Sequence, residues 1–211
     1  MTQKTNKNTL IIFLKYPESG KVKTRLAKDI GNNEAARIYS LMALNIIESV
    51  VAPECYNTII FYDPPEKEQE IKNWVGKKEI QYAPQAGNTL GDRISNAFKA
   101  VFSSGIEKAV IIGTDCLDVS SDIINVAIHL LDETEVVLGP AEDGGYYLLG
   151  LNKYEPQVFQ DIDWSTEHVL EQTVLKIVEN KLTYHKLKTL KDIDTVEDIN
   201  DQFGDILRKA Q

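Results

Sequence analysis

The sequence predicts an α/β fold built around a mostly parallel β-sheet. Short apolar runs such as Thr9–Leu14 (TLIIFL) and Lys108–Ile112 (KAVII) do not alternate with polar residues, which is typical of strands buried on both faces. Segments with helical spacing of apolar residues separate these runs, and that alternation indicates crossovers between parallel strands. Because no stretch resembles a linker or a repeat, we expect a flexible tail over residues 1–8 and a single domain over residues 9–211.

The first half of the chain alternates strands with helices. After the strand at Thr9–Leu14 comes a loop over residues 15–31. Apolar residues at helical spacing then predict a helix at Asn33–Val51. The other expected elements of this half are a strand at Asn57–Tyr62, a polar helix at Glu66–Val75, a weak strand at Glu79–Tyr82, a helix at Thr89–Phe102 and the strand at Lys108–Ile112.

The second half continues the pattern. Its expected elements are a helix at Ser121–Leu131 with a serine N-cap, strands at Glu135–Leu138 and Tyr146–Leu151, a helix at Thr166–Asn180 capped by Ser165, an extended segment at Thr183–Leu190 and a last helix from Thr195 to about Lys209. An acid three residues after Thr195 predicts a capping box there. Ligands of such sheets bind beyond the carboxyl ends of the strands. We therefore expect the loops that start at Lys15, Asp63, Asp115 and Pro140 to lie near one another.

Composition excludes several classes of protein. Of the 211 residues, 43% are hydrophobic and 26% are charged, which is too apolar for a disordered chain. A net charge of −9 argues against binding to a nucleic-acid backbone, which requires clustered Lys and Arg. Cys55 and Cys116 have no spacing typical of a metal site or a disulfide framework. No apolar run approaches the ~20 residues of a membrane span, and no signal peptide is visible, so we expect a cytoplasmic protein.

Charge is divided unevenly along the chain. Residues 1–112 carry 15 basic and 12 acidic residues, whereas residues 113–211 carry 8 basic and 20 acidic residues. Within the first part, residues 15–28 hold five Lys or Arg residues against the single acid Glu18. A basic loop and acidic clusters in one domain are consistent with a site for phosphates and a divalent cation. A solvated surface with random charge grouping is the alternative.

Two loops after buried strands hold candidate phosphate and metal ligands. Pro17, Ser19 and Gly20 form a turn that leads into three cationic residues, and such a loop can present N–H groups and cations to phosphates. It is neither a Walker A motif nor a dinucleotide fingerprint, and a solvated basic loop is the alternative. Asp115 follows the strand at Lys108–Ile112, where it can hold a hard cation or merely cap the next turn.

Two further segments are rich in acids. In residues 139–147 (GPAEDGGYY), the glycines permit close approach to a ligand, and Glu142 and Asp143 can bind metal or an acceptor, although a tight hairpin would use the same residues. The two Asp-Ile-Asp segments, at 161–163 and 192–194, each place two carboxylates on one face in extended backbone. We interpret the first pair as helix-dipole residues and favour a functional role for Asp194. The three histidines show no pattern of nucleophile and base.

Five of these segments occur in a characteristic order. They are Lys15–Leu26 (KYPESGKVKTRL), Gly113–Cys116 (GTDC), Gly139–Gly150 (GPAEDGGYYLLG), Asp163–Thr166 (DWST) and Asp192–Thr195 (DIDT). Together they resemble a family of small bacterial proteins described as glycosyltransferase-A-like, or radical-SAM/selenodomain-associated, transferases. The resemblance runs from about Leu10 to Phe203. This sequence has Leu117 where the family usually has proline after GTDC.

The resemblance implies the nucleotide-diphospho-sugar transferase fold, a three-layer α/β/α sandwich with a mostly parallel sheet that binds a nucleotide at its N-terminal half. The superfamily includes glycosyltransferases and nucleotidyltransferases. The family resemblance implies that phosphates contact the loop after the first strand, which here carries Lys15, Gly20, Lys23 and Arg25. It also implies that Asp115 binds a metal, with Asp194, or Asp192 beside it, as the second ligand.

The resulting hypothesis is a transferase that uses a nucleotide-sugar and Mg²⁺ or Mn²⁺ to glycosylate a small acceptor. Lys23 and Arg25 would neutralise phosphate charge, Thr114 would belong to the nucleotide site, and Asp143 would contact the acceptor or activate its hydroxyl. The expected acceptor-binding residues are Glu142, Asp143, Gly144, Gly145, Tyr146, Trp164, Ser165 and Thr166.

Two alternatives stay open. The first is a nucleotidyltransferase that attaches NMP from an NTP to a small phosphorylated or sugar substrate and releases pyrophosphate. The second is a non-catalytic nucleotide-binding module. The chain has neither the full glycine-rich signature of nucleotidyltransferases nor the DxD of many glycosyltransferases, since residues 113–115 carry one Asp only. The base, the sugar, the acceptor and the oligomeric state are not specified by the sequence.

Overall fold

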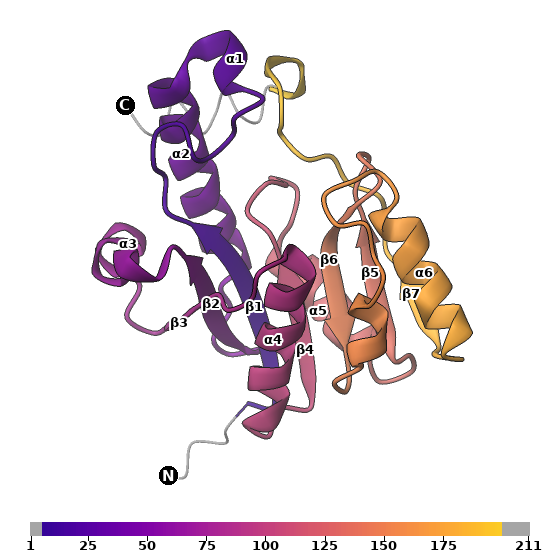
Figure 1. The fold of residues 1–211 in the computed structure, drawn as a ribbon. Helices are drawn as coiled ribbons and strands as arrows, with labels where there is room; N and C mark the ends of the chain where they lie inside the picture. Colours follow the sequence, from indigo (N-terminus) through magenta and orange to yellow (C-terminus); the bar gives the residue numbers. More distant parts are fainter. Residues whose placement is uncertain (1–5, 200–211) are drawn as a thin grey trace.

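A seven-stranded sheet lies at the centre of the computed structural model, which describes residues 6–199 (Figure 1). Its order is β3-β2-β1-β4-β6-β5-β7. The strands are β1 (Asn8–Lys15), β2 (Asn57–Asp63), β3 (Gln81–Pro84), β4 (Lys108–Ile112), β5 (Val136–Pro140), β6 (Tyr146–Leu151) and β7 (Tyr184–Lys186). Only β6 runs antiparallel to its neighbours, β4 and β5, among these strands. The predicted mostly parallel sheet is therefore confirmed.

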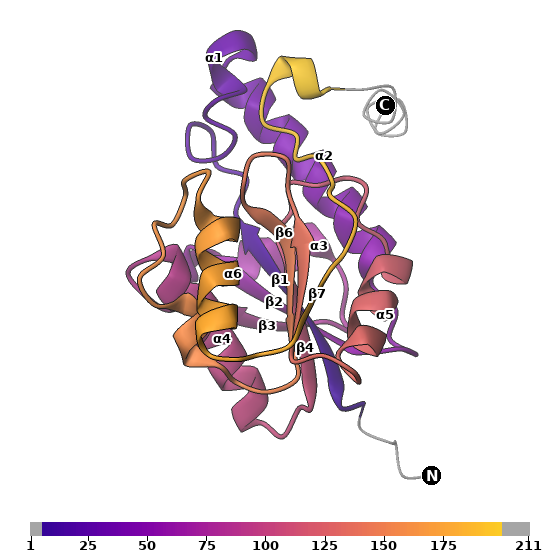
Figure 2. The same ribbon diagram turned by 90° about the vertical axis from the view of Figure 1, so that its right-hand side faces the viewer.

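Helices cover both faces of the sheet, as Figure 2 shows. They are α1 (Ala27–Ile30), α2 (Asn32–Val50), α3 (Glu68–Val75), α4 (Leu90–Ser103), α5 (Ser121–Leu130) and α6 (Val169–Glu179), with short 3₁₀ turns η1 (Pro65–Lys67), η2 (Pro156–Phe159) and η3 (Val196–Asp198). Side chains of α2, α3 and α5 pack in one core cluster, and those of α4, α6 and η2 pack in the other. The fold is thus the expected three-layer α/β/α sandwich.

The central strand β1 shows why these runs lack alternation. Leu10 and Ile12 face the core of α2, whereas Ile11 faces the core of α4, and all three are fully buried. Full burial of one such side chain contributes about 1.5–3 kcal/mol. Since both faces are covered, each position of the strand is apolar, and the strand ends with its carboxyl end pointing at the loop that begins at Lys15.

The predicted start of α6 is wrong. The helix begins at Val169, with His168 at the N-cap, so Ser165 does not cap it. Instead Ser165 has a positive φ of 66°, and the Thr166 hydroxyl donates to the Asp163 carbonyl at 2.7 Å. These residues form a turn that directs the chain toward the edge of the sheet. Because tertiary contacts impose this turn, the helical spacing of apolar residues does not predict it.

The ends of the chain lie partly outside the described residues. Asn8, which we expected in the tail, is the first residue of β1, and residues 1–5 of that tail fall outside the described part. Thr195 and Asp198 form both bonds of the predicted capping box and open η3. The remainder of the predicted last helix, residues 200–209, falls outside the described part. Among residues 6–199, none of the helices combines the length and the apolarity that crossing a membrane requires.

Candidate active site

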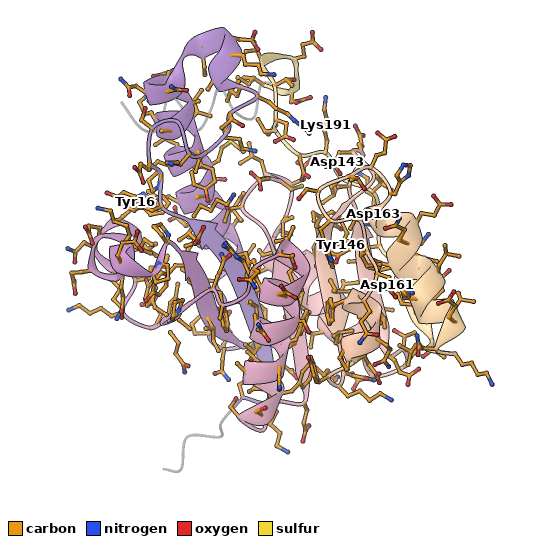
Figure 3. All side chains as sticks on the ribbon, in the orientation of Figure 1. Tyr16, Asp143, Tyr146, Asp161, Asp163 and Lys191 are labelled. Atoms are coloured by element: carbon orange, nitrogen blue, oxygen red, sulfur yellow. The ribbon has the colours of Figure 1, made fainter. Side chains whose placement is uncertain are left out.

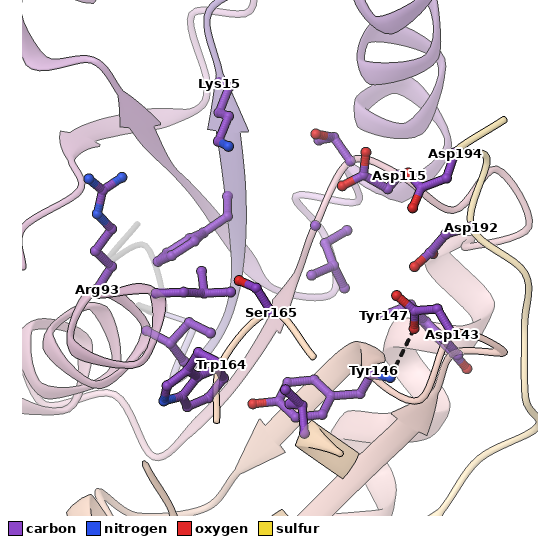
Figure 4. Close-up of a pocket in the computed structure, with 18 of the residues that line it drawn as sticks. Lys15, Arg93, Asp115, Asp143, Tyr146, Tyr147, Trp164, Ser165, Asp192 and Asp194 are labelled. Atoms are coloured by element: carbon purple, nitrogen blue, oxygen red, sulfur yellow. Dashed lines mark hydrogen bonds between the residues drawn. The ribbon is translucent and has the colours of Figure 1, made fainter. Parts of the chain in front are cut away.

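A cavity of about 1000 Å³ opens beyond the carboxyl ends of β1 and β4 (Figure 4). Five segments far apart in the sequence line it: residues 13–25, 85–94, 111–115, 143–147 and 164–169, joined by Asp192 and Asp194. This is the sheet edge at which the sequence places the strand-end loops. The loop that starts at Asp63 contributes indirectly, because the Asp63 carboxylate pairs with Arg93, a lining residue, at 3.3 Å.

The loop after β1 supplies most of the cations of the cavity. Lys15, Lys21, Lys23 and Arg25 all line it. The backbone N–H of Lys15 donates to the Tyr39 hydroxyl at 3.0 Å, which fixes the point where the loop leaves the strand. Tyr39 is 4% exposed, and burial raises the pKa of its phenol, so the phenol stays a neutral hydrogen-bonding group. The start of the loop is therefore anchored to α2.

Lys23 lies at the junction of the loop with two carboxylates. Its Nζ is 2.5 Å from Asp115 Oδ1 and 3.1 Å from Asp194 Oδ1, and it also donates to the Ile193 carbonyl at 2.5 Å. The side chain is 3% exposed. Burial alone would lower the pKa of Lys23, but the two carboxylates outweigh it and raise the pKa above its ordinary value. Lys23 is thus a buried, charged ammonium.

Asp115 lies in the loop that follows β4. The neighbouring Thr114 hydroxyl is 3.0 Å from the Tyr39 hydroxyl, and Thr114 is 2% exposed. The carbonyl of Asp115 accepts from the Ile193 N–H at 2.9 Å. Its side chain is half exposed toward the cavity. The loop 113–115 therefore holds the Asp115 carboxylate at the cavity wall. It also fixes, through the Ile193 hydrogen bond, the segment that carries Asp192 and Asp194.

That segment, residues 190–199, forms a strap across the end of the sheet. Leu190 bridges to Ala141, and its carbonyl accepts from the Glu142 N–H at 3.1 Å. Farther along, Asp194 Oδ2 pairs with Arg25 Nη1 at 3.2 Å. Figure 1 shows the strap running from the β5 side of the sheet toward α1. It brings acids from the end of the chain to the basic loop near its start.

Asp192 forms no ion pair with a cation of residues 6–199, and neither does Asp143, whereas Asp194 contacts both Lys23 and Arg25. Burial, and then the charges of Asp115 and Asp143, raise the pKa of Asp192 to about 7. Figure 4 shows these four carboxylates along one wall of the cavity. The wall therefore carries more negative charge than Lys23 and Arg25 can neutralise.

This donor set fits a hard divalent cation. Carboxylate oxygens are the ligands that Mg²⁺ prefers, and Mg²⁺ usually binds through one or two carboxylates together with substrate phosphates and water. Asp115 and Asp194 both contact one ammonium group, so their oxygens lie within a few ångströms of each other. Within residues 6–199 no group of three or more His, Cys, Asp or Glu side chains is placed to hold a metal ion by itself. A bound cation would take its remaining ligands from phosphate and water.

The turn between β5 and β6 is both a hairpin and a cavity wall. Asp143 Oδ1 accepts from the Gly145 N–H at 2.8 Å, the bond drawn in Figure 4. Gly144 has a φ of 88°, and a Cβ there would lie 2.1 Å from the Glu167 carbonyl oxygen. The turn can therefore pack against the segment 163–168 only because residue 144 is a glycine.

Aromatic rings form the floor beside this turn. The rings of Tyr146 and Trp164 meet edge to face, with centroids 6.5 Å apart. The Trp164 indole also lies against Gly91 of α4, where a Cβ would approach its Nε1 to 2.2 Å. Ser165 and Thr166 continue the wall with two hydroxyls. This half of the cavity is therefore less charged than the half near Asp115.

Some predicted residues do not line the cavity. Gly20 is in the turn of the basic loop, with a φ of 79°, and Gly144 supports the hairpin from behind. Glu142 is exposed. Most of the predicted set does line it, namely Lys15, Lys23, Arg25, Thr114, Asp115, Asp143, Gly145, Tyr146, Trp164, Ser165, Thr166 and Asp194.

The first Asp-Ile-Asp pair lies away from the cavity, beside α6 (Figure 3). Asp161 pairs with Lys176 at 3.2 Å, and Asp163 accepts from the Gln172 side chain at 2.7 Å. Both residues therefore make structural contacts, but with side chains along α6. These direct contacts stand in place of the predicted interaction with the helix dipole.

Sequence reasoning missed the wall formed by residues 85–94. Arg93 lines the cavity, pairs with Asp63 and donates to the Gly87 carbonyl at 3.2 Å. Gln85 and Asn88 lie beside it. The sequence feature that could have predicted this wall is the glycine-containing stretch between β3 and α4, because it starts at the carboxyl end of a parallel strand. Because β3 has four residues and is mostly exposed or half-buried, its sequence pattern is weak.

Comparisons with known proteins identify the fold and the family. A crystal structure from Desulfovibrio desulfuricans G20, provisionally assigned as a nucleotide-diphospho-sugar transferase, is 31% identical with a TM-score of 0.90, and the match covers 97% of this chain and 95% of that one. Two more distant structures share the fold. CMP:2-keto-3-deoxy-manno-octonic acid synthetase complexed with CTP is 10% identical with a TM-score of 0.58, over 96% of this chain and 99% of the other.

The second distant structure is 4-diphosphocytidyl-2C-methyl-D-erythritol synthase from Anaerococcus prevotii DSM 20548, which is 14% identical with a TM-score of 0.60, over 96% of this chain and all of the other. No curated protein matches the sequence. Residues 46–166 match the model of a family described as "Uncharacterized protein conserved in bacteria (DUF2064)". The chain has the nucleotide-diphospho-sugar transferase fold and belongs to the DUF2064 family.

Proposed function

We propose that the chain is a metal-dependent transferase that takes a nucleotide-sugar as donor and glycosylates a small acceptor. The observation that carries the proposal is the cavity in which a basic loop faces a wall of four carboxylates. Anionic phosphates suit the first side, and the cation that accompanies them suits the second. The assignment of the 31% identical protein supports the donor class. The five motifs extend the proposal to the radical-SAM/selenodomain-associated branch.

In this proposal the donor phosphates lie against the loop after β1. Lys15 and Arg25 provide charge at the cavity wall, and Thr114 borders the same space. Arg25 is 68% exposed and holds Asp194 through a single 3.2 Å contact, so its other guanidinium donors can reach a phosphate. Lys23 would join them once it leaves the carboxylates. These cations would stabilise the charge that develops on the leaving nucleotide.

Asp115 is the proposed first ligand of Mg²⁺ or Mn²⁺. The sequence predicts Asp194 as the second, but Lys23 and Arg25 already neutralise that carboxylate. Asp192 forms no ion pair with a cation of residues 6–199, which makes it the stronger candidate, and either residue comes from the same strap. A divalent cation held there would neutralise charge on the donor phosphates and offset the charge of the carboxylate wall.

The acceptor would occupy the half of the cavity lined by the β5–β6 turn and by residues 164–166. Asp143 Oδ1 is held by the Gly145 N–H, which orients the carboxylate toward the cavity. We propose that it binds an acceptor hydroxyl or accepts its proton. The aromatic floor of Tyr146 and Trp164, with the hydroxyls of Ser165 and Thr166, suits a small molecule that is itself rich in hydroxyl groups.

Nucleotidyl transfer is the second candidate, and the basic loop favours it. Lysine and arginine side chains gathered after β1 suit a triphosphate at least as well as a diphosphate. Two proteins of this fold, whose names describe nucleotidyl products, support the same idea. In this reaction an acceptor oxygen would attack the α-phosphorus, and pyrophosphate would leave.

The product distinguishes the two reactions. The purified chain would be incubated with Mn²⁺ and either nucleotide-sugars or nucleoside triphosphates, together with a panel of small hydroxylated and phosphorylated acceptors. Glycosyl transfer releases a nucleoside diphosphate, whereas nucleotidyl transfer releases pyrophosphate. Asp143→Asn should lower the rate, by about 10²–10⁴-fold if Asp143 is the general base. Nucleotide binding without turnover on any acceptor of the panel would favour the non-catalytic module.

A further inference from the structure

Lys23 is the most constrained cation of the cavity. An ammonium group has three N–H donors, and those of Lys23 are matched by three acceptors: Asp115 Oδ1, Asp194 Oδ1 and the Ile193 carbonyl. The side chain is 3% exposed, compared with 68% for Arg25. In this state Lys23 has no donor left for a phosphate. The residue that the sequence assigns to the phosphates is engaged with the carboxylates instead.

We infer that Lys23 is an internal counter-ion, which a divalent cation must displace from Asp115 before the site can be loaded. The inference rests on the proposed function, because it takes Asp115 as a metal ligand. Nζ lies 2.5 Å from Asp115 Oδ1, so the ammonium occupies the position from which a metal ion would bind that oxygen. Two cations on one carboxylate oxygen repel each other strongly in a buried site. Binding of the one therefore weakens binding of the other.

The displaced ammonium has a second place to go within the same cavity. Lysine carries its charge on a flexible four-carbon stem, and Lys23 belongs to the loop whose other cations face the proposed phosphate position. A phosphate bound there would accept the ammonium as the metal takes Asp115. Metal and phosphate would then favour each other's binding, and the metal alone would bind weakly. Lys23 thereby couples binding of the metal at Asp115 to binding of the phosphate at the basic loop.

Arg25 does not have the same role. Among residues 6–199, its guanidinium forms an ion pair only with Asp194, at 3.2 Å, and it is largely in solvent, where an ion pair contributes little. Lys28 offers a matched control for the charge alone. It is an exposed lysine of α1, five residues farther along, and it neither lines the cavity nor pairs with a carboxylate of residues 6–199. Lys28→Met therefore removes one positive charge from the same part of the chain but leaves the Lys23 ammonium on Asp115.

The test measures Mn²⁺ binding to the full chain in the absence of nucleotide, by electron paramagnetic resonance or calorimetry. Lys23→Met keeps the length of the side chain and removes its charge. We expect this variant to bind Mn²⁺ at least about tenfold more tightly than the wild type, as loss of a buried competing charge implies. Lys28→Met should bind it with wild-type affinity. Equal affinity of Lys23→Met and wild type would overturn the inference.

Lys23→Met leaves two carboxylates without their ammonium, so its fold needs a separate check. Its melting temperature should fall without metal and should rise with Mn²⁺ by more than that of the wild type does. The wild type provides a second measurement. The slowly exchanging ammonium of Lys23 should give a resolved ¹⁵N resonance in nuclear magnetic resonance spectra, which should shift or broaden as Mg²⁺ is added. A resonance unchanged at saturating Mg²⁺ contradicts the displacement.

The outcomes separate the inference from the function on which it rests. Tight and equal Mn²⁺ binding by the wild type, Lys23→Met and Lys28→Met would support the metal site and would refute competition between Lys23 and the metal. Absence of Mn²⁺ binding in all three would refute the metal site itself, and the competition with it. Weaker binding by Lys23→Met would mean that Lys23 supports the metal rather than competes with it.

Discussion

At the scale of single residues, Asp192 decides the electrostatics of the candidate site. It is a half-buried carboxylate whose charged neighbours are Lys23 and three acids, Asp115, Asp143 and Asp194, and it forms no ion pair with a cation of residues 6–199. Its pKa of about 7 means that the site carries a group that resists ionisation. Such a group is a cost to folding at alkaline pH, unless a cation is bound beside it.

That cost predicts a dependence of stability on pH. The pKa of Asp192 is about 7 in the folded protein, compared with 3.8 for an ordinary aspartate. Because the folded state holds the proton more tightly, the stabilising contribution is full below about pH 4 and is lost progressively as the pH rises from there through about 7. In metal-free buffer, Asp192→Asn should therefore raise the melting temperature at about pH 8.5 by at least about 2–4 °C, and by less than half as much at about pH 5.

Thermal melts of the wild type and the variant at both pH values check this prediction. Asp118→Asn provides the control, since Asp118 is an exposed aspartate three residues after Asp115. It should keep the pH dependence of the wild type. If Asp192→Asn also keeps that dependence, Asp192 is not the group responsible.

At the scale of elements, the cavity depends on contact between the β5–β6 turn and the segment 163–168. Gly144 makes this contact possible, because any Cβ there would collide with the Glu167 backbone. Leu170 at the start of α6 also donates its N–H to the Gly144 carbonyl at 2.9 Å. The turn and α6 are therefore positioned together, and with them Asp143 and Trp164.

Replacement of Gly144 by alanine tests this contact. Gly105 is a matched control, because it has the same positive φ of 88° but nothing within 4 Å of the added Cβ. Gly105→Ala should lower stability only by the cost of a left-handed alanine, about 1–2 kcal/mol. Gly144→Ala adds a collision with backbone and should lower the melting temperature at least twice as much, as measured by differential scanning calorimetry. Equal losses would show that the contact does not constrain the turn.

The sequence predicts elements well where burial on both faces shapes them. The strands β4 and β6 have the predicted bounds, and β1 extends the prediction by one residue at each end. The prediction fails where a tertiary contact overrides local preference. Ser165 and Thr166 have N-cap chemistry, yet they form the turn against Gly144. Arg93 was missed because its place in the cavity depends on a short edge strand with little apolar signal.

At the scale of the whole molecule, the division of charge along the sequence becomes a division across one cavity. The basic loop of residues 15–25 comes from the first half of the chain, and Asp115, Asp143, Asp192 and Asp194 come from the second. The sequence shows the two groups but not their contact, since Lys23 and Asp194 lie 171 positions apart. The strap 190–199 closes that gap, as both views of the ribbon show (Figures 1 and 2).

The central claim is that this cavity binds a nucleotide together with a divalent cation held by Asp115. The most direct measurement is the melting temperature of the wild type and of Asp115→Asn with nucleotide-sugars and nucleoside triphosphates, each with and without Mn²⁺. We predict that at least one nucleotide raises the melting temperature of the wild type, and that Asp115→Asn loses the part of this rise that depends on Mn²⁺. No rise with any nucleotide, or a Mn²⁺-dependent rise that survives in Asp115→Asn, would contradict the claim.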